Sequence, residues 1–291
     1  AAGFWADEGV SVAAQHADLQ VVWVLRTPDD FDGVDLARYR IALRDANKES
    51  LGAGLVWTDL DGDALDDLVA TAPERSLVGQ SGGGFDVYTG EELQRQRMPS
   101  DPSATDLGLG VAGTMDGERL GTSLAVGDLD GDGLAEVVIG GTVGDPSDLG
   151  RVLVVQLGAL EAYGLDRLSL DALPVSAAHT WLVSDTPADA LGQSLASVDG
   201  QGLAIGAPAY GGDDGRVYTI AASPDFFDSV ERSVEEDAAA VIDTNAPDEG
   251  FGVALSVAGD VDTDGQADLW ILSDGVGNEA PRAVLLFDTR L

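Results

Sequence analysis

Short apolar runs bounded by glycine or acidic residues recur along the whole chain, and they indicate strands rather than helices. The stretch GDLDGDGLAEVVIGG, residues 127–141, shows the pattern. Alternating aspartates and glycines lead to Glu136 and the β-branched run Val137–Ile139, and two glycines close it. The run predicts a buried β-strand, and the acidic part before it predicts a tight turn that enters the strand.

The acidic turn has the Asp-x-Asp-x-Asp-Gly pattern with which chains wrap oxygen ligands around calcium, and EF-hand loops are the best-known example. An EF-hand needs a bidentate glutamate at loop position 12, at the start of a helix. Counted from Asp128, position 12 is Ile139, an apolar residue of the predicted strand. The sequence therefore predicts a calcium loop inside a β-hairpin and excludes an EF-hand at this position.

The same hairpin pattern repeats along the chain, with a strand, a turn and a second strand in each copy. It is strong in Leu51–Pro73, Leu120–Thr142 and Phe251–Asp274, shorter in Leu191–Pro208 and weak in Glu8–Pro28. Near the start of each copy stands a glycine, termed a marker glycine below: Gly9, Gly52, Gly121, Gly192 and Gly252. Five copies predict five structural repeats.

Two further strands are predicted in each repeat. Third strands begin at Gly84, Gly150, Gly215 and Arg282, and fourth strands precede the next marker glycine in RIALRDANKESLG, DLGLGVAGTMDGERLG, TWLVSDTPADALG and AVIDTNAPDEGFG. Four short strands in a unit of about 60 residues are typical of a β-propeller blade. One blade cannot bury both of its faces, so the blades are expected to stack around an axis.

The fold class predicted is therefore all-β, a β-propeller of about five four-stranded blades that forms a single domain over residues 1–291. The first blade is short, with an abbreviated third strand expected near Asp32–Ala37. The last blade stops after its third strand, whereas GFWADEGV at the start has the pattern of a fourth strand before Gly9. We expect this N-terminal strand to complete the last blade, which closes the ring and removes an open edge. The alternative is a fragment of a larger ring.

The repeats resemble the FG-GAP repeats of integrin α-subunit β-propellers, in a bacterial-type form with fewer blades. The resemblance rests on LGTSL, DLDGDG and VIGGT within residues 120–142 and on the ending Gly206-Ala207-Pro208. It implies aspartate turns between the first and second strands of a blade, and partner binding on the opposite loops. Integrin propellers have seven blades, so the partner and ligand chemistry of the integrin headpiece do not carry over.

Three of the turns contain four carboxylates each, and a tight loop can supply the roughly six to eight oxygens that calcium takes. Aspartates are common in turns, but three copies at one place in the repeat, each with mutually repelling carboxylates, indicate ion sites. We expect about three Ca²⁺ ions. The family pattern also places ligands at positions 1, 3, 5, 7 and 9. The expected ligands are Asp59, Asp61, Asp63, Asp67 and the Leu65 carbonyl; Asp128, Asp130, Asp132, Glu136 and the Leu134 carbonyl; Asp260, Asp262, Asp264, Asp268 and the Gln266 carbonyl.

Some loop residues depart from the common pattern. Glu136 stands where aspartate is usual, and Ala64 stands where glycine is common, so the 59–67 loop is expected to be strained. The turns at Ser197–Gln201 and His16–Asp18 have too few carboxylates for an ion. We expect the ions to be structural, with affinities of about 10⁻⁴–10⁻³ M, as in extracellular modules.

The net charge of −37 makes nucleic acid and anionic membranes unfavourable partners. Three divalent ions leave most of this charge in place, so a hydrated surface suited to salty water is expected to account for much of it. There is no cysteine, no window that resembles a membrane span and no signal peptide in AAGFWADEG. Abundant calcium outside cells favours an extracellular or cell-surface location for a secreted, mature chain.

Catalytic side chains are few, and no enzyme is predicted. His16 and His179 are the only histidines, and His179 is expected at the surface or at an edge. Residues 81–84 are rich in glycine but lack the lysine of a phosphate loop. The adjacent acids Glu91 and Glu92 are expected to face solvent rather than to act as a glycosidase pair. The five tryptophans lie in predicted strands and are expected to fill the space between blades.

The function predicted is that of a monomeric, calcium-binding module for adhesion or protein interaction. A protein or glycan ligand is expected on the loop face opposite the calcium turns, in residues 27–36, 72–84, 142–150 and 208–215. These loops are acidic, which favours a cationic or cation-bridged ligand. A carbohydrate-binding, lectin-like propeller and, less favoured, a propeller enzyme acting on polysaccharide are the alternatives.

Overall fold

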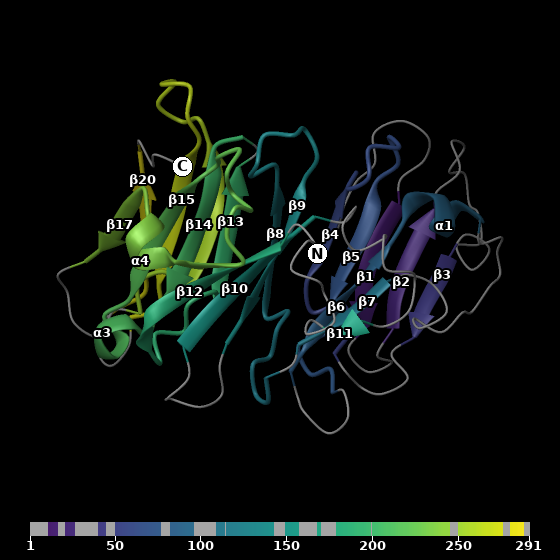
Figure 1. The fold of residues 1–291 in the computed structure, drawn as a ribbon, viewed down its shortest axis with the longest axis horizontal. Coiled ribbons are helices and arrows are strands. Elements are labelled where there is room, and N and C mark those ends of the chain that lie inside the picture. Colours follow the sequence, from purple (N-terminus) through teal and green to yellow (C-terminus); the bar gives the residue numbers. More distant parts are fainter. Residues whose placement is uncertain are drawn as a thin grey trace. The chain divides into compact units, whose positions relative to one another are not determined.

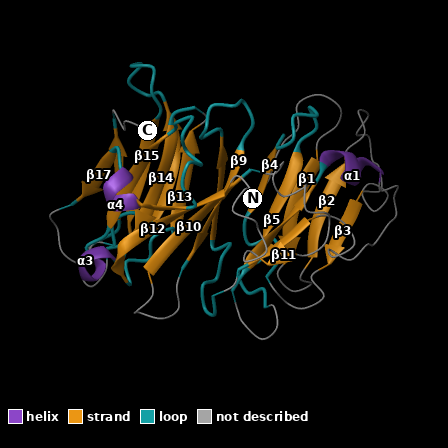
Figure 2. Ribbon diagram, viewed as in Figure 1, coloured by secondary structure: helices purple, strands orange, loops and turns teal. Residues whose placement is uncertain are grey.

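The computed structural model describes the chain in thirteen segments: residues 11–16, 21–26, 40–44, 50–76, 82–95, 109–113, 115–142, 149–156, 168–169, 179–198, 200–244, 250–275 and 280–287. The chain divides into two compact units, residues 1–122 with 160–174 and residues 123–159 with 175–291. Strands predominate in both units, and the helices are few and short (Figures 1 and 2). The expectation of an all-β fold is confirmed for the described residues.

The described strands form five sheets, which follow one another along the chain in the order of the five sequence repeats. The first unit contains two of them. One has the order β1-β2-β3, with β1 (Ser11–His16), β2 (Val21–Arg26) and β3 (Arg40–Arg44). The other has the order β11-β7-β6-β5-β4, with β4 (Leu55–Thr58), β5 (Asp67–Thr71), β6 (Gly84–Tyr88), β7 (Leu109–Ala112) and β11 (Leu168–Ser169); α1 (Gly90–Arg95) follows β6.

The second unit contains the other three sheets. The first has the order β16-β12-β10-β9-β8, with β8 (Ser123–Gly127), β9 (Glu136–Gly141), β10 (Leu149–Val155), β12 (His179–Pro187) and β16 (Glu231–Ser233). The next is β13-β14-β15-β17, with β13 (Ser194–Val198), β14 (Gly202–Ala207), β15 (Arg216–Ala221) and β17 (Ala240–Asp243). The last is β18-β19-β20, with β18 (Ala254–Gly259), β19 (Asp268–Ser273) and β20 (Arg282–Leu286). The helices are α3 (Tyr210–Asp213) and α4 (Val234–Asp237).

The second strand of the repeat is fully buried in three of the five sheets. Every residue of β5, β9 and β14 is buried. This explains their sequences, because continuous apolar runs of small and β-branched residues suit a strand that is covered on both faces. In β19 burial alternates instead, and Trp270 is 39% exposed. Trp270 therefore lies on the face of its sheet that no other sheet of the second unit covers, and the expectation that it fills the space between two blades stays a prediction.

The first repeat differs from its prediction. RIALR, expected as a fourth strand, is β3 and pairs directly with β2, so that Val24 lies opposite Ile41. The pairing leaves no place for a strand between them, and it brings two apolar segments into register. The third strand expected near residues 32–37 lies outside the described residues.

Two short strands were not predicted. β11 pairs in parallel with β7, and β16 pairs in parallel with β12. Each belongs to a connection that leaves a third strand and returns to form the fourth strand of its own sheet, and each covers the outer edge of the preceding sheet. Covering an edge removes unpaired backbone groups from solvent. Such strands have no local sequence signal, because two or three residues such as Glu231-Arg232-Ser233 carry no apolar alternation.

The three sheets of the second unit pack face to face in chain order. Alternate residues of β14 point to opposite faces. Leu203 and Ile205 join a core with Val138 and Val152 of the preceding sheet. Ala204 joins a second core with Leu269 of the following sheet, which also includes Val217, Phe251 and Ile271. The β13–β17 sheet is thus covered on both faces.

Marker glycines join neighbouring sheets where they pack. The Gly192 carbonyl accepts a hydrogen bond from Ser123 Oγ of the preceding sheet, and the Gly252 carbonyl accepts one from Ser194 Oγ in the same way. Gly192 has φ +86°, and a Cβ there would lie 2.8 Å from Val152 Cγ2. The apolar-Gly pattern is therefore required both by the backbone conformation and by the close approach of the sheets.

The first unit carries a buried ion pair that the sequence analysis missed. Arg75 Nη2 lies 2.7 Å from Asp86 Oδ2, and both side chains are almost fully buried. Nη1 of the same arginine donates to the carbonyls of Phe85 and Val111, and the Tyr88 hydroxyl donates to Asp86 Oδ2. Because the guanidinium donors are satisfied by β6 and β7, the side chain fixes the 72–76 segment against that sheet.

Candidate metal centres

The three aspartate turns lie where they were predicted, between the first and second strands of their repeats. They join β4 to β5, β8 to β9 and β18 to β19. In the second unit, the 128–136 and 260–268 loops project from the same end of their sheets, whereas α3 lies at the other end (Figure 1). Loop positions are numbered 1 to 9 below, from Asp59, Asp128 or Asp260.

The backbone of each loop is folded around its own carboxylates. In the 128–136 loop, the carboxylate at position 1 accepts hydrogen bonds from the backbone N–H groups of positions 4 and 6. The carboxylate at position 3 accepts one from the N–H of position 5, the carboxylate at position 5 one from the N–H of position 7, and the carboxylate at position 9 one from the N–H of position 2. The 59–67 loop has the same five hydrogen bonds. The 260–268 loop keeps four and has a bond from the position 5 N–H to position 1. Each carboxylate at positions 3, 5 and 9 accepts a loop hydrogen bond with one of its two oxygens. Its second oxygen accepts none of these loop bonds.

The folded loops bring together three predicted ligands in each repeat. One carboxylate oxygen from each of positions 1, 3 and 9 lies within 4.8 Å of the others. The groups are Asp59, Asp61 and Asp67; Asp128, Asp130 and Glu136; and Asp260, Asp262 and Asp268. The position 5 carboxylates Asp63, Asp132 and Asp264 are held in the same loops by the position 7 N–H groups. Coordination by position 5, and by the carbonyls of Leu65, Leu134 and Gln266, stays a prediction.

The position 9 carboxylates show whether a cation suits these loops. Asp268 is fully buried, and its Oδ1 has no hydrogen-bond partner in the part of the chain that the structure describes. Burial raises the pKa of Asp67 to about 6 and that of Glu136 to about 7, and the charges of neighbouring loop aspartates contribute to both rises. Buried, crowded carboxylates that favour protonation are the groups that a bound cation would stabilise in ionised form. The donor set, carboxylate oxygens alone, is that of a hard cation such as Ca²⁺.

Loop positions 4 and 6 have left-handed backbone conformations. Glycine occupies both in the 128–136 loop, at φ +81° and +93°. Ala64 at position 6 has φ 65°, which confirms that alanine stands there at a conformational cost. Thr263 at position 4 has φ 66°, and the sequence analysis missed this. A β-branched residue in this region is rare, so the 260–268 loop carries the greater strain.

The turn of the fourth repeat, which has too few carboxylates for an ion, is hydrogen-bonded to two of the aspartate loops. Gly200 N donates to the Asp128 carbonyl at 2.8 Å, and Gln201 Oε1 accepts from Ala267 N at 3.0 Å. Ser223 N donates to the Leu129 carbonyl at 2.8 Å. The fourth repeat, in which Asp199 lies outside the described residues, therefore joins the two neighbouring loops through hydrogen bonds.

Among the described residues, a side chain from outside the loops contacts the 128–136 carboxylate cluster. Gln156, directly after β10, places its Nε2 2.7 Å from Asp130 Oδ2, with Asp132 Oδ2 at 3.3 Å and Glu136 Oε1 at 3.4 Å. This residue was not predicted from the sequence. The signal that could have found it is register, because Val155 pairs with Val137 and the next residue must lie beside Glu136.

No enzyme was predicted, in part because His179 was expected at the surface or at an edge of a sheet. His179 is 7% exposed, so the expectation of a surface position is wrong; it pairs with Val155 of β10, and β16 pairs with β12 only at residues 181–183. Glu91 is exposed as expected, whereas the side chain of Glu92 and residue Ser81 lie outside the description. Residues 11–49, with the turn at His16–Asp18, have no described side chains.

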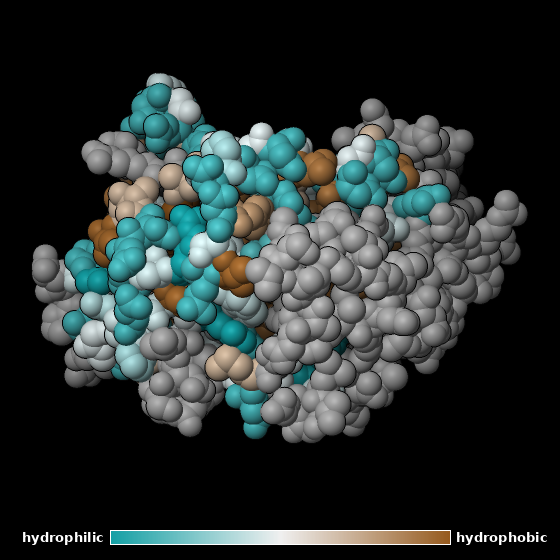
Figure 3. Space-filling model, viewed as in Figure 1, coloured by the Kyte–Doolittle hydropathy of each residue, from teal (hydrophilic) through white to brown (hydrophobic). Residues whose placement is uncertain are grey.

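The end of the second unit opposite the loops is polar and acidic. Tyr210 of the 208–215 segment is stacked by the Arg216 guanidinium at 3.7 Å, and Arg216 also pairs with Asp243 at 2.8 Å. Close by in sequence, Asp213 and Asp214 follow Gly211 and Gly212, which have positive φ. Much of the other predicted partner loops, at 27–36, 77–81 and 143–148, lies outside the described residues. Hydrophilic residues predominate on the described surface in the view of Figure 3.

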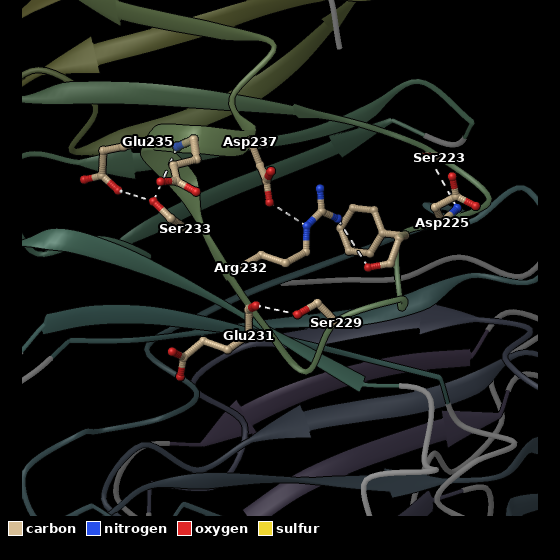
Figure 4. A network of polar contacts seen from close by, with 10 residues as sticks. Ser223, Asp225, Ser229, Glu231, Arg232, Ser233, Glu235 and Asp237 are labelled. Carbon is tan, nitrogen blue, oxygen red and sulfur yellow. Dashed lines mark hydrogen bonds and ion pairs between the residues drawn. The ribbon is translucent and has the colours of Figure 1, made fainter.

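The segment that contains β16 and α4 is held by its own polar network (Figure 4). Arg232 pairs with Asp237 at 2.7 Å and donates to the Phe226 carbonyl. Glu235 accepts hydrogen bonds from the Ser184 and Tyr218 hydroxyls and from the Asp185 N–H. Glu235 therefore joins β12 to β15 and stabilises the packing of two sheets.

A comparison with protein families matches residues 120–155 to the FG-GAP repeat. The match covers β8, β9 and β10 with the 128–136 loop, and it confirms the resemblance stated from the sequence. FG-GAP repeats are typical of interaction modules rather than of enzymes. The search of curated proteins returned no match. No helix in the described segments has the length and apolar character needed to span a bilayer.

Proposed function

We propose that the chain is a calcium-binding extracellular β-propeller that serves adhesion or protein interaction. The observation that carries the proposal is the repetition of one carboxylate cluster three times, with an acidic side chain at each of positions 1, 3 and 9 and with four backbone hydrogen bonds common to all three loops. The FG-GAP match at residues 120–155 supports the interaction role. An enzyme acting on polysaccharide is not favoured.

Calcium would be held by the loop carboxylates and would supply positive charge to groups that otherwise repel each other. The candidate ligands in each loop are the side chains of positions 1, 3, 5 and 9 and the carbonyl of position 7. The chain's own residues do the rest: the backbone N–H groups orient each carboxylate, and Leu60 and Leu129 at position 2 anchor two of the loops in the interior. The ions are therefore proposed to be structural, because they stabilise hairpins that carry neighbouring sheets.

We further propose that the five sheets are the blades of a single propeller domain. The second unit supports this, because its three sheets stack in chain order and its last sheet has an uncovered face with Trp270 and Leu272. β20 is an edge strand in the described part of that sheet. Residues 1–9 are the proposed fourth strand. Deletion of residues 1–9 should expose the edge and cause aggregation, and a deletion variant that stays monomeric and equally stable would refute the strand exchange.

The ligand is proposed to be a protein with cationic groups, bound at the acidic end opposite the calcium loops. The support is the acidity of the 208–215 segment and the general acidity of the chain. A glycan is the second candidate, because the half-buried Tyr210 lies at the same end, with Arg216 stacked on its ring. A glycan-array signal that survives mutation of the calcium loops would favour the lectin-like alternative.

A thermal melt in calcium and in excess chelator tests the proposed metal centres. Ligand binding to the native state stabilises it by about 2.7 kcal/mol per site when calcium is at 100 times Kd. Addition of calcium to the chelated protein should therefore raise Tm by many degrees, and magnesium, which prefers stricter octahedral geometry, should raise it less. An unchanged Tm in calcium would contradict the proposal.

A further inference from the structure

We propose that Gln156 is an additional, out-of-loop ligand that distinguishes the 128–136 metal centre from the other two. The inference rests on the proposed calcium sites and adds a residue to one of them. Its basis is the place of the Gln156 amide, which contacts the oxygens of positions 3, 5 and 9 that the loop backbone leaves over.

The contacts are not those of a residue that merely packs nearby. Asp130, Asp132 and Glu136 each give one oxygen to a loop N–H. The Gln156 Nε2 lies 2.7–3.4 Å from the other oxygen of each of the three. The amide therefore points at the convergence of the free carboxylate oxygens, which is where a cation would bind.

A bound cation and the amide N–H₂ group cannot both face the same oxygens, because the N–H₂ group only donates hydrogen bonds. A half-turn about χ3 of Gln156 exchanges Nε2 for Oε1, and this terminal torsion is broad and roughly two-fold. The backbone of the residue stays in place, because the preceding Val155 is paired with both Val137 and His179. The turned side chain would present a carbonyl oxygen, a ligand type that calcium accepts from glutamine.

The other two loops have no amide side chain at the equivalent third-strand position of the described residues. Register places Thr89 beside Asp67 and Phe287 beside Asp268, since Tyr88 pairs with Leu68 and Leu286 with Leu269. At the 59–67 loop, the position 9 carboxylate accepts from the Gly90 N–H instead. At the 260–268 loop, the Asp268 Oδ1 has no partner among the described residues, and Phe287 is 47% exposed. The three loops therefore have similar carboxylates but different third-strand neighbours.

Calcium titration of the full chain by isothermal calorimetry tests the assignment, with wild type, Gln156→Ala and Gln156→Glu. We expect Gln156→Ala to lower the affinity for one ion in three by about tenfold and to leave the other two unchanged. Gln156→Glu should restore that affinity, because it returns an oxygen ligand at the same length. Gln193→Ala is the matched control: it removes the same atoms at the marker-glycine end of β13, away from the aspartate loops.

A second variant works by gain rather than loss. Phe287→Gln should raise the affinity for a different single ion, and because the phenyl ring is half exposed, the substitution should leave the fold intact. Melts in chelator complete the test: a purely structural role for Gln156 would lower Tm without changing any calcium affinity. A lower Tm without any change in calcium affinity would overturn the assignment. So would a calcium affinity of Gln156→Ala that equals or exceeds that of wild type. Wild-type protein that binds no calcium would instead refute the proposed function on which it rests.

Discussion

The 128–136 and 260–268 loops follow the same nine-residue pattern in one compact unit, yet their surroundings differ at every level. The 128–136 loop lies against the next sheet. Its Leu129 is fully buried, and its backbone carbonyls accept hydrogen bonds from Gly200 and Ser223. The equivalent of Leu129 in the other loop is Val261, which is 52% exposed. The comparison shows that one aspartate-loop motif can be part of a core or stand largely outside it.

Strain follows the same division. Both left-handed positions of the 128–136 loop are glycine, whereas Thr263 occupies one of them in the 260–268 loop. The position 9 carboxylates differ too. Glu136 accepts a hydrogen bond from the Gln156 amide, whereas Asp268 has a buried oxygen without a partner among the described residues. We therefore expect the 260–268 loop to depend more on its ion than the 128–136 loop does.

The largest difference between the loops should come from position 2. Leu129→Ala removes a fully buried side chain from the core between two sheets and should lower the free energy of unfolding by about 2–5 kcal/mol. Val261→Ala removes an exposed side chain and should change it by about 0.5 kcal/mol or less. Urea denaturation in excess calcium measures both variants. Equal losses would show that the two loops are equally integrated into the core and would remove the contrast between them.

A smaller, opposite pair of effects is expected from position 4. Gly131→Thr forces a β-branched residue into φ near +81° and should cost about 1–2 kcal/mol. Thr263→Gly relieves the same strain and should increase stability, by less than that amount because glycine gains freedom in the unfolded chain. Thermal melts at fixed calcium compare the two. A loss of stability in Thr263→Gly would contradict the assignment of strain to this loop.

A buried carboxylate outside the loops sharpens the comparison further. Asp189 is fully buried, its Oδ1 accepts from the Leu191 N–H, and its Oδ2 has no partner in the described part of the chain. Burial raises its pKa, and the charge of Glu235 adds to this. Because the folded-state pKa is above the unfolded one, the folded state binds the proton more tightly, and stability is lost as pH rises through the folded pKa.

Asp189→Asn should therefore stabilise the protein at pH 8 by about 1 kcal/mol, the cost of one unsatisfied buried group. The gain should be smaller at pH 5, because the raised pKa shifts proton uptake by the wild-type carboxyl to a higher pH than for an ordinary aspartate. Chemical denaturation at the two pH values measures it, with Asp185→Asn, an exposed acid on the same strand end, as the control. A gain that is the same at both pH values would show that the charge of Asp189 is not the cause.

The hairpins and the aspartate loops were predictable from the sequence because their signals are local. The run from Glu136 to Gly141 and the aspartates before it determine a strand and a turn within fifteen residues. Long-range features have no such signal. β16 and the hydrogen bond between Gln201 and Ala267 both depend on contact with a neighbouring sheet. β3 pairs directly with β2, and this pairing of distant segments has no local signal in the sequence. The strain at Thr263 was within reach, because position 4 is glycine in the other two loops.

The most direct test of the metal centres is the number of calcium ions bound, measured by equilibrium dialysis against several millimolar calcium. Wild-type protein should bind about three ions per chain, and Asp130→Ala and Asp262→Ala should each bind about two, because each removes a carboxylate from one centre. Combined, the two substitutions should leave about one. Wild-type protein that binds no calcium, or that binds the same number after both substitutions, would contradict the central claim that these loops are metal centres.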